Sequence, residues 1–276
     1  MSDLPISPLL QQISAMAREA AEAILEVYSQ DFDVQRKADH SPVTAADLAA
    51  QRVIVAGLAQ LDESLPVLSE ESRVAPWAQR REWSRYWLVD PLDGTREFIK
   101  RNGEFSVNIA LIDRHEPVLG VVLAPVTGDL YAAERGAGAW LQAGASAVWA
   151  RIATRPLANP PVVAGSRSHG SYGAALLQEL LGDGYLESPL GSSLKFCLLA
   201  RGDADIYLRR GATSEWDTAA AQCVLEAAGG AVLDLAGRPL RYNRHDSLIN
   251  PEFLAVGDMD IDWAARLQAA EIEPHD

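Results

Sequence analysis

The hexapeptide Asp90-Pro91-Leu92-Asp93-Gly94-Thr95 follows the apolar run Trp87-Leu88-Val89. The run predicts a strand, and Pro91 fixes φ and turns the chain out of it. Gly94 permits an unusual backbone conformation or the close approach of a ligand. A helical turn that begins at Thr95 would direct free N–H groups towards an anion. The sequence therefore predicts two carboxylates and an anion-binding turn at the end of a strand.

Two carboxylates at this spacing suit Mg²⁺, a hard ion that takes oxygen ligands and keeps waters and substrate phosphate around it. The Leu92 backbone carbonyl, between Asp90 and Asp93, offers a further oxygen. The alternative is an Asx-type turn with solvated aspartates, which is the commoner explanation of an isolated Asp-x-x-Asp. The complete string after a strand favours the metal site.

Four more acidic residues stand at the start or end of predicted elements. Glu70 and Glu71 follow a short apolar run, and adjacent residues on a strand point to opposite faces, so at most one is expected to enter a metal site. Asp217 precedes a predicted helix, where an acid commonly complements the helix dipole. Asp47 lies three residues after Thr44, a spacing that by itself predicts a capping box. Each therefore has a structural alternative to a role in a site.

The composition limits the classes of partner. The chain has 276 residues, of which 48% are hydrophobic, and its formal net charge is −14. Such a charge repels nucleic acid, so a polymer-binding role is excluded, whereas carboxylate-held cations would attract a phosphate substrate. Cys197 and Cys223 are expected to be buried free thiols, and two isolated thiols cannot form a structural zinc site.

The location of the protein is predicted from the absence of sorting signals. The sequence shows neither a signal peptide at its N-terminus nor a run of roughly 18 apolar residues that could span a membrane. Together with the low cysteine content, this predicts a cytoplasmic protein. A peripheral association with the membrane and the choice between monomer and homodimer stay open.

The order of predicted elements divides the chain into two lobes. Residues 8–28 and 45–61 have apolar residues at helical spacing, and a strand-rich meander follows them, which makes residues 1–150 an α+β lobe. Strands and helices alternate in residues 151–276, which is typical of an α/β lobe. The boundary is expected in the weakly patterned stretch Gly136–Asn159.

Four strings together resemble the inositol monophosphatase superfamily, in this order: Ser41–Asp47, Ser69–Ser72, Asp90–Thr95 and Trp216–Ala220. The resemblance implies a five-layered αβαβα sugar-phosphatase fold. It also implies two or three Mg²⁺ ions, inhibition by Li⁺ and a metal-activated water. The implied metal ligands are Glu70, Asp90, Leu92 (through its carbonyl), Asp93 and Asp217. Asp47 and Thr95 would orient the water, and Gly94 and Thr95 would hold the phosphate through their N–H groups.

Three further strings, Ala164–His169, Gly191–Cys197 and Tyr207–Arg209, resemble the 3′(2′),5′-bisphosphate nucleotidase branch of the superfamily. This branch hydrolyses adenosine 3′,5′-bisphosphate to AMP and phosphate, and its sulfated analogue PAPS is a second candidate substrate. A second phosphate needs donors away from the metals. The residues expected to bind substrate, besides Gly94 and Thr95, are His169, Ser192, Lys195, Arg209 and Asp217. Two alternatives remain: an inositol or sugar monophosphatase, and a catalytically silent metal-binding regulator.

Overall fold

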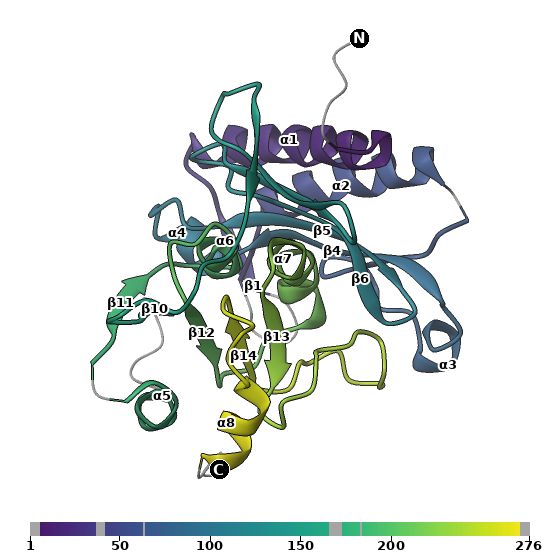
Figure 1. Ribbon diagram of the computed structural model, residues 1–276. Coiled ribbons are helices and arrows are strands. Elements are labelled where there is room, and N and C mark those ends of the chain that lie inside the picture. The colour runs from purple at the N-terminus through teal and green to yellow at the C-terminus, as the bar shows by residue number, and fades with distance from the viewer. Residues whose placement is uncertain (1–5, 37–41, 63, 166–172, 183, 271–276) are drawn as a thin grey trace.

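Two main β-sheets and three layers of helices alternate through the molecule (Figure 1). The structure is a computed structural model that describes residues 6–36, 42–62, 64–165, 173–182 and 184–270. The layers follow one another as helices, sheet, helices, sheet and helices, which confirms the αβαβα arrangement. Within the described ranges, no helix has both the length and the apolar character needed to cross a membrane.

The first outer layer consists of α1 (Pro8–Tyr28) and α2 (Ala45–Leu61), which coincide with the ranges that the apolar spacing predicts. The hydroxyl groups of Ser7 and Thr44 accept backbone N–H groups of the first turns and so begin the two helices. The apolar stripes of both helices are buried against the large sheet. This burial contributes more to their stability than helix propensity does. A short antiparallel pair, β1 (Val34–Arg36) and β2 (Pro42–Thr44), leads into α2.

The large sheet has seven strands in the order of the chain. Its strands are β3 (Val67–Ser69), β4 (Arg85–Asp93), β5 (Ser106–Asp113), β6 (Glu116–Leu123), β7 (Leu130–Glu134), β8 (Gly138–Gln142) and β9 (Trp149–Ile152). Only the pair of β3 and β4 is parallel among them. Two short helices flank β4, α3 (Trp77–Arg80) and α4 (Thr95–Ile99). Strands β8 and β9 lie in the stretch where the sequence shows only a weak pattern, and their side chains are mostly half-buried or exposed.

The second sheet has five strands in the order β11-β10-β12-β14-β13. Its strands are β10 (Val162–Gly165), β11 (Leu186–Pro189), β12 (Ile206–Arg209), β13 (Ala231–Asp234) and β14 (Phe253–Val256). Strands β11, β10 and β12 are parallel, as the predicted alternation of strands and helices requires. Strand β14 pairs antiparallel with both of its neighbours.

Helices α6 (Leu194–Ala200) and α7 (Glu215–Ala228) form the middle layer, between the two sheets. Helix α7 packs on β4 to β8 of the large sheet and on β13 of the small one. Helices α5 (Ala174–Leu181) and α8 (Trp263–Ala269) cover the outer face of the small sheet. Both cysteines are buried free thiols, as predicted. Because α7 joins the two halves through one core, the division at residue 150 stays a prediction.

Candidate metal and substrate site

The end of β4 brings two carboxylates to the point where the strand becomes a helix. The pairing of β4 with β5 shifts register between Asp90 and Asp93, where Pro91 has no N–H to donate. The Leu92 N–H instead donates to Oδ1 of Asp90 at 3.0 Å. Gly94 then adopts a φ of +93°, and α4 begins at the next residue. The predicted change from strand to helix is therefore confirmed.

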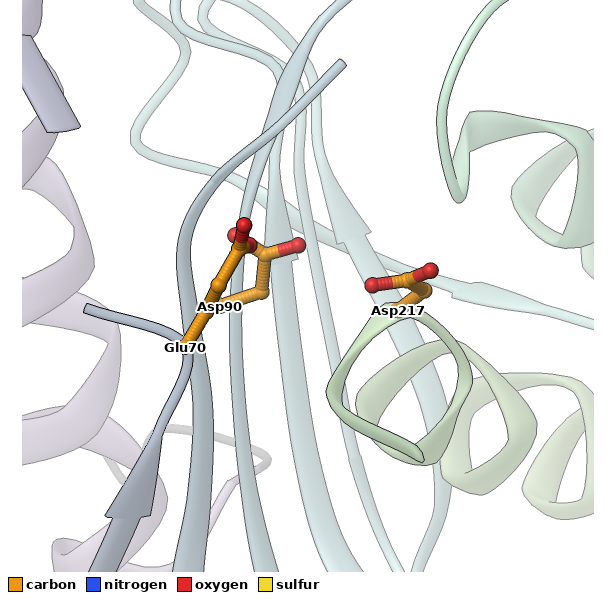
Figure 2. A group of neighbouring side chains, drawn as sticks. All are labelled: Glu70, Asp90 and Asp217. Atoms are coloured by element: carbon orange, nitrogen blue, oxygen red, sulfur yellow. The ribbon is translucent and has the colours of Figure 1, made fainter. Parts of the chain in front are cut away.

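Three carboxylates from different elements meet at this point. Glu70, Asp90 and Asp217 each offer an oxygen within 4.8 Å of the other two. Figure 2 shows Glu70 and Asp90 together on the strand side, with Asp217 facing them from the first turn of a helix. The Glu70 N–H donates to the Val89 carbonyl at 3.2 Å, which fixes the end of β3 beside β4. Oδ2 of Asp217 accepts the Ser214 N–H at 2.9 Å, so this residue both caps α7 and joins the cluster.

The negative charges of the clustered carboxylates repel one another. Burial raises the pKa of Asp90 well above its usual range, and the negative charges of Glu70, Asp93 and Asp217 raise it further. The pKa of Asp217 is raised well above its usual range by burial and then by the charge of Asp93. Burial raises the pKa of Asp93 to about 6, although the Lys195 charge lowers it. Divalent cations would relieve this repulsion, and the hard oxygen donors of these residues fit Mg²⁺.

Asp93 is held beside the cluster by Ser193, which was not predicted from the sequence as a site residue. Its Oδ2 accepts the Ser193 N–H at 2.5 Å. The Ser193 hydroxyl donates to Oδ1 of Asn108 at 2.8 Å and lies 2.9 Å from the Ser106 hydroxyl. The position of Ser193 within the string Gly191–Cys197 is the only signal in the sequence that could have indicated it.

Asp47 and Thr95 are adjacent, as the resemblance implies. Oδ2 of Asp47 accepts the Thr44 N–H at 2.8 Å and the Thr44 hydroxyl at 2.7 Å. The first of these bonds belongs to the predicted capping box between Thr44 and Asp47, which is present. Its other oxygen, Oδ1, accepts the Thr95 hydroxyl at 3.2 Å. Burial raises the pKa of Asp47, although its bonds to Thr44 lower it. Asp47 therefore caps α2 with one oxygen and contacts Thr95 with the other.

A cavity of about 110 Å³ opens beside the cluster. The residues predicted from sequence that line it are Asp93, Gly94, Ser192, Lys195, Arg209 and Asp217. Its wall also includes Tyr207, from the string Tyr207–Arg209, and Glu97 and Phe253, which were not predicted from the sequence. The structure thus brings metal-ligand candidates and phosphate-binding candidates to one cavity. His169 lies outside the described residues.

The two basic residues of the cavity already have backbone partners. The Lys195 ammonium group donates to the carbonyl groups of Ser192 at 2.6 Å and Leu190 at 3.2 Å, and it lies 5.0 Å from the centre of the Tyr207 ring. Burial lowers the pKa of Lys195 to about 8, although the Asp93 charge raises it. Arg209 donates to carbonyl groups of the loop that follows it. Lys195 therefore shapes the loop around Ser192 besides contributing charge to the cavity.

The chain is similar to known proteins over nearly its whole length. The family model described as "Inositol monophosphatase family" matches residues 6–265. A protein of Escherichia coli named 3′(2′),5′-bisphosphate nucleotidase CysQ is 51% identical over 247 residues, which cover 89% of this chain and 98% of the relative. The Haemophilus influenzae protein of the same name is 36% identical over 267 residues, or 94% of this chain and 97% of its own length.

Solved structures show the same fold. The crystal structure of CysQ from Bacteroides thetaiotaomicron matches with a TM-score of 0.77 and 39% identity, covering 90% of this chain and 97% of the other. An IMPase of Thermotoga maritima matches with a TM-score of 0.77 at 22% identity, covering 95% and 96% of the two chains. The second likeness supports the fold alone.

Proposed function

Because the chain belongs to the inositol monophosphatase family, we propose that it is a Mg²⁺-dependent phosphomonoesterase that hydrolyses adenosine 3′,5′-bisphosphate to AMP and phosphate. The near full-length similarity to proteins named 3′(2′),5′-bisphosphate nucleotidase supports this substrate. The observation that carries the proposal is the single cavity that Asp93 and Asp217 share with Lys195 and Arg209. PAPS, which has the same 3′-phosphate, is proposed as a second substrate.

Five oxygen donors would hold two or three Mg²⁺ ions: carboxylates of Glu70, Asp90, Asp93 and Asp217, and the Leu92 carbonyl. Bound Mg²⁺ would supply Lewis acidity for the scissile phosphate, a lower pKa for the attacking water and a counter-charge for the departing 3′-oxygen. Li⁺ is expected to inhibit by competing for one of these positions.

Thr95 and Asp47 would direct the attacking water. The Thr95 hydroxyl donates to Oδ1 of Asp47, so its lone pairs are available to accept a proton from the water. Its own proton would then move towards Asp47. Burial raises the pKa of Asp47 and makes it a better proton acceptor. The water attacks in line with the departing 3′-oxygen, and no covalent phosphoenzyme forms.

The second phosphate of the substrate would bind at the far side of the cavity. Ser192 offers a hydroxyl, Lys195 an ammonium group and Arg209 a forked donor. All three line the cavity that Asp217 also lines. A monophosphate of inositol would leave these donors unused, which favours the bisphosphate nucleotide. His169 stays a predicted contact to phosphate or base.

A substrate panel tests the proposal. Phosphate release from adenosine 3′,5′-bisphosphate, inositol 1-phosphate and fructose 1,6-bisphosphate is compared with Mg²⁺ and with EDTA. We expect kcat/KM to be at least about tenfold higher for the bisphosphate nucleotide, a difference of ~1.4 kcal/mol in transition-state stabilisation. A preference for inositol 1-phosphate would favour the inositol monophosphatase alternative. No release from any substrate would favour a silent regulator.

The environment of the enzyme follows from its chemistry. The two free, buried thiols suit a reducing compartment, and we propose the cytoplasm. A peripheral location at the membrane and a monomeric or homodimeric state are both compatible with the proposal.

A further inference from the structure

A network of three buried polar residues joins the first turn of α7 to the connection between β3 and β4. Its members are Glu215, Asn243 and Arg80, which are 5%, 0% and 1% exposed. They belong to α7, to the stretch between β13 and β14, and to α3. None of these three residues lines the cavity described above.

Asn243 is the central residue of this network. Its backbone N–H donates to both carboxylate oxygens of Glu215, at 2.9 and 2.8 Å. Its side-chain oxygen accepts Nη1 of Arg80 at 2.7 Å, and its side-chain nitrogen donates to the Arg80 carbonyl at 2.6 Å. Asn243 has a φ of +52°, a conformation that asparagine adopts more readily than most residues. One residue therefore couples a helix to a loop through backbone and side chain together.

One end of this network is close in sequence to a clustered carboxylate, and the other end lies between the remaining two. Glu215 precedes Asp217 by two residues in the first turn of α7. Arg80 ends α3, which lies in the connection between β3 and β4. Glu70 follows β3, and Asp90 lies on β4. The network thus links the segment between Glu70 and Asp90 to the helix that carries Asp217.

Stability alone does not explain this arrangement. A buried ionic network is weak evidence for stability, because the desolvation of its charges offsets much of their attraction. The Arg80 Nε and the Tyr86 hydroxyl are buried nearby and have no hydrogen-bond partner in the described part of the chain. The network therefore does not satisfy all its polar groups, which favours a role other than stability.

The cluster itself supplies a reason for such a link. Oxygens of Glu70, Asp90 and Asp217 lie within 4.8 Å of one another, so the ionised carboxylates that a cation requires would repel one another and push the first turn of α7 away from β4. We infer that Glu215 is a positioning residue that, through Asn243 and Arg80, holds Asp217 against this repulsion, so that the cation meets a preformed site. The inference rests on the proposed function, because it assumes that the cluster binds divalent cations.

Calorimetric titration of the metal-free full chain with Mn²⁺, which accepts the same oxygen ligands as Mg²⁺, tests the inference. Glu215→Ala is expected to weaken Mn²⁺ binding about 10-fold, the lower end of the effect of residues that support metal ligands. Glu215→Gln is expected to restore wild-type affinity, since its amide oxygen can still accept the Asn243 N–H. Glu226→Gln is the matched control, because it removes a carboxylate from the same helix at a point about 16 Å from Glu215 along the helix axis.

The dependence of activity on Mg²⁺ separates positioning from a loss of folded protein. For Glu215→Ala the Mg²⁺ concentration at half-maximal activity should rise about 10-fold, while kcat at saturating Mg²⁺ stays within about threefold of wild type. Partial unfolding would instead lower activity at every Mg²⁺ concentration. Asn243→Gly keeps the positive φ and the N–H to Glu215 but loses both side-chain bonds to Arg80. Asn243→Gly should therefore also bind Mn²⁺ more weakly than wild type, and it replaces Glu215→Ala in the test if that variant does not fold.

Two results would overturn the inference. Wild-type Mn²⁺ affinity in both Glu215→Ala and Asn243→Gly would show that the link has no effect on the site. Equal weakening in Glu215→Ala and Glu215→Gln would show that the charge of Glu215 matters and that its hydrogen bond does not. If wild-type protein bound no Mn²⁺, the proposed metal site itself would fail, which is a different outcome from either of these.

Discussion

The Thr95 hydroxyl donates to Oδ1 of Asp47 at 3.2 Å and so joins the first residue of α4 to the first turn of α2. The other oxygen of Asp47 is occupied by Thr44. One carboxylate therefore serves two purposes: it caps a helix and it offers an acceptor to the hydroxyl that would receive a proton from water.

Asp47→Asn should lower kcat by about 10²- to 10⁴-fold, the usual effect of removing a group that accepts a proton. The KM for adenosine 3′,5′-bisphosphate should change little, because Asp47 does not line the cavity. Steady-state phosphate release at saturating Mg²⁺ measures both. Asp62→Asn at the opposite end of α2 is the control and should retain wild-type kcat. A kcat for Asp47→Asn within threefold of wild type would remove Asp47 from the mechanism.

The stability of the metal-free protein should fall as pH rises from about 4 to about 6. Burial raises the pKa of Asp93 to about 6 in the folded state, so the folded state holds a proton that the unfolded state has already lost. The stability that this proton gives is present below the unfolded pKa and is lost as pH rises through the folded value. Thermal unfolding in EDTA should therefore give a lower Tm at pH 7 than at pH 5.

Asp93→Asn provides the control for this pH dependence. The amide carries no charge, so in EDTA the variant should have a higher Tm than wild type at pH 7. Its Tm should also rise less than that of wild type when the pH is lowered from 7 to 5. Mg²⁺ should reverse the order at pH 7, because the cation stabilises the wild-type carboxylate. If the Tm of wild type in EDTA rose with pH in parallel with the Tm of Asp93→Asn, Asp93 would not be the cause of this pH dependence.

Lys195→Met should discriminate between substrates with one and two phosphates. A hydrogen bond to a charged group contributes about 1.5–3 kcal/mol, so KM for adenosine 3′,5′-bisphosphate should rise roughly 10- to 100-fold. The KM for adenosine 3′-monophosphate should rise much less. Because Lys195 also binds the carbonyl groups of Leu190 and Ser192, a disturbed loop would raise both KM values. An equal rise for the two substrates would therefore argue against a second phosphate site.

Gly94→Ala should destabilise the protein and reduce its activity. Gly94 has a φ of +93°, and an added Cβ would lie 3.2 Å from the Glu104 carbonyl oxygen and 3.3 Å from Cβ of Ser192. Gly136→Ala is the matched control, since Gly136 has a φ of +81° and nothing within 4 Å of an added Cβ. In chemical denaturation the free energy of unfolding should fall by about 1–2 kcal/mol in the control, from backbone strain alone, and by more in Gly94→Ala. Equal losses would mean that the contacts of Gly94 are unimportant.

The parts of the fold that local sequence determines were predictable. The string from Asp90 to Thr95 combines a proline without an N–H and a glycine at positive φ, and these two residues favour the change from strand to helix at this point. The ranges of α1 and α2 follow from apolar residues at helical spacing, because one face of each helix is buried. Strands β8 and β9 could not be predicted in this way, because side chains that are half-buried on both faces leave no alternation to detect.

The supporting contacts of the site were not predictable, because they join residues that are distant in sequence. Ser193 donates to Asp93 across 100 residues, and Arg80 and Asn243 are separated by 163 residues. Lys195 was predicted as a charge for phosphate, but its bonds to Leu190 and Ser192 depend on the path of a loop. A motif therefore indicates which residue types act, whereas tertiary packing determines what holds them in place.

The dependence of phosphate release on Mg²⁺ in wild type and in Asp90→Asn is the most direct test of the proposed metal site. Asp90 is 1% exposed and shares the cluster with Glu70 and Asp217. Wild-type activity on adenosine 3′,5′-bisphosphate should vanish in EDTA and return with Mg²⁺. The variant should stay folded in EDTA and release phosphate at least about 10³-fold more slowly at every Mg²⁺ concentration, a loss of ~4 kcal/mol. More than about a tenth of wild-type activity at saturating Mg²⁺ in the folded variant would contradict the proposed site, since that is a loss of only ~1.4 kcal/mol.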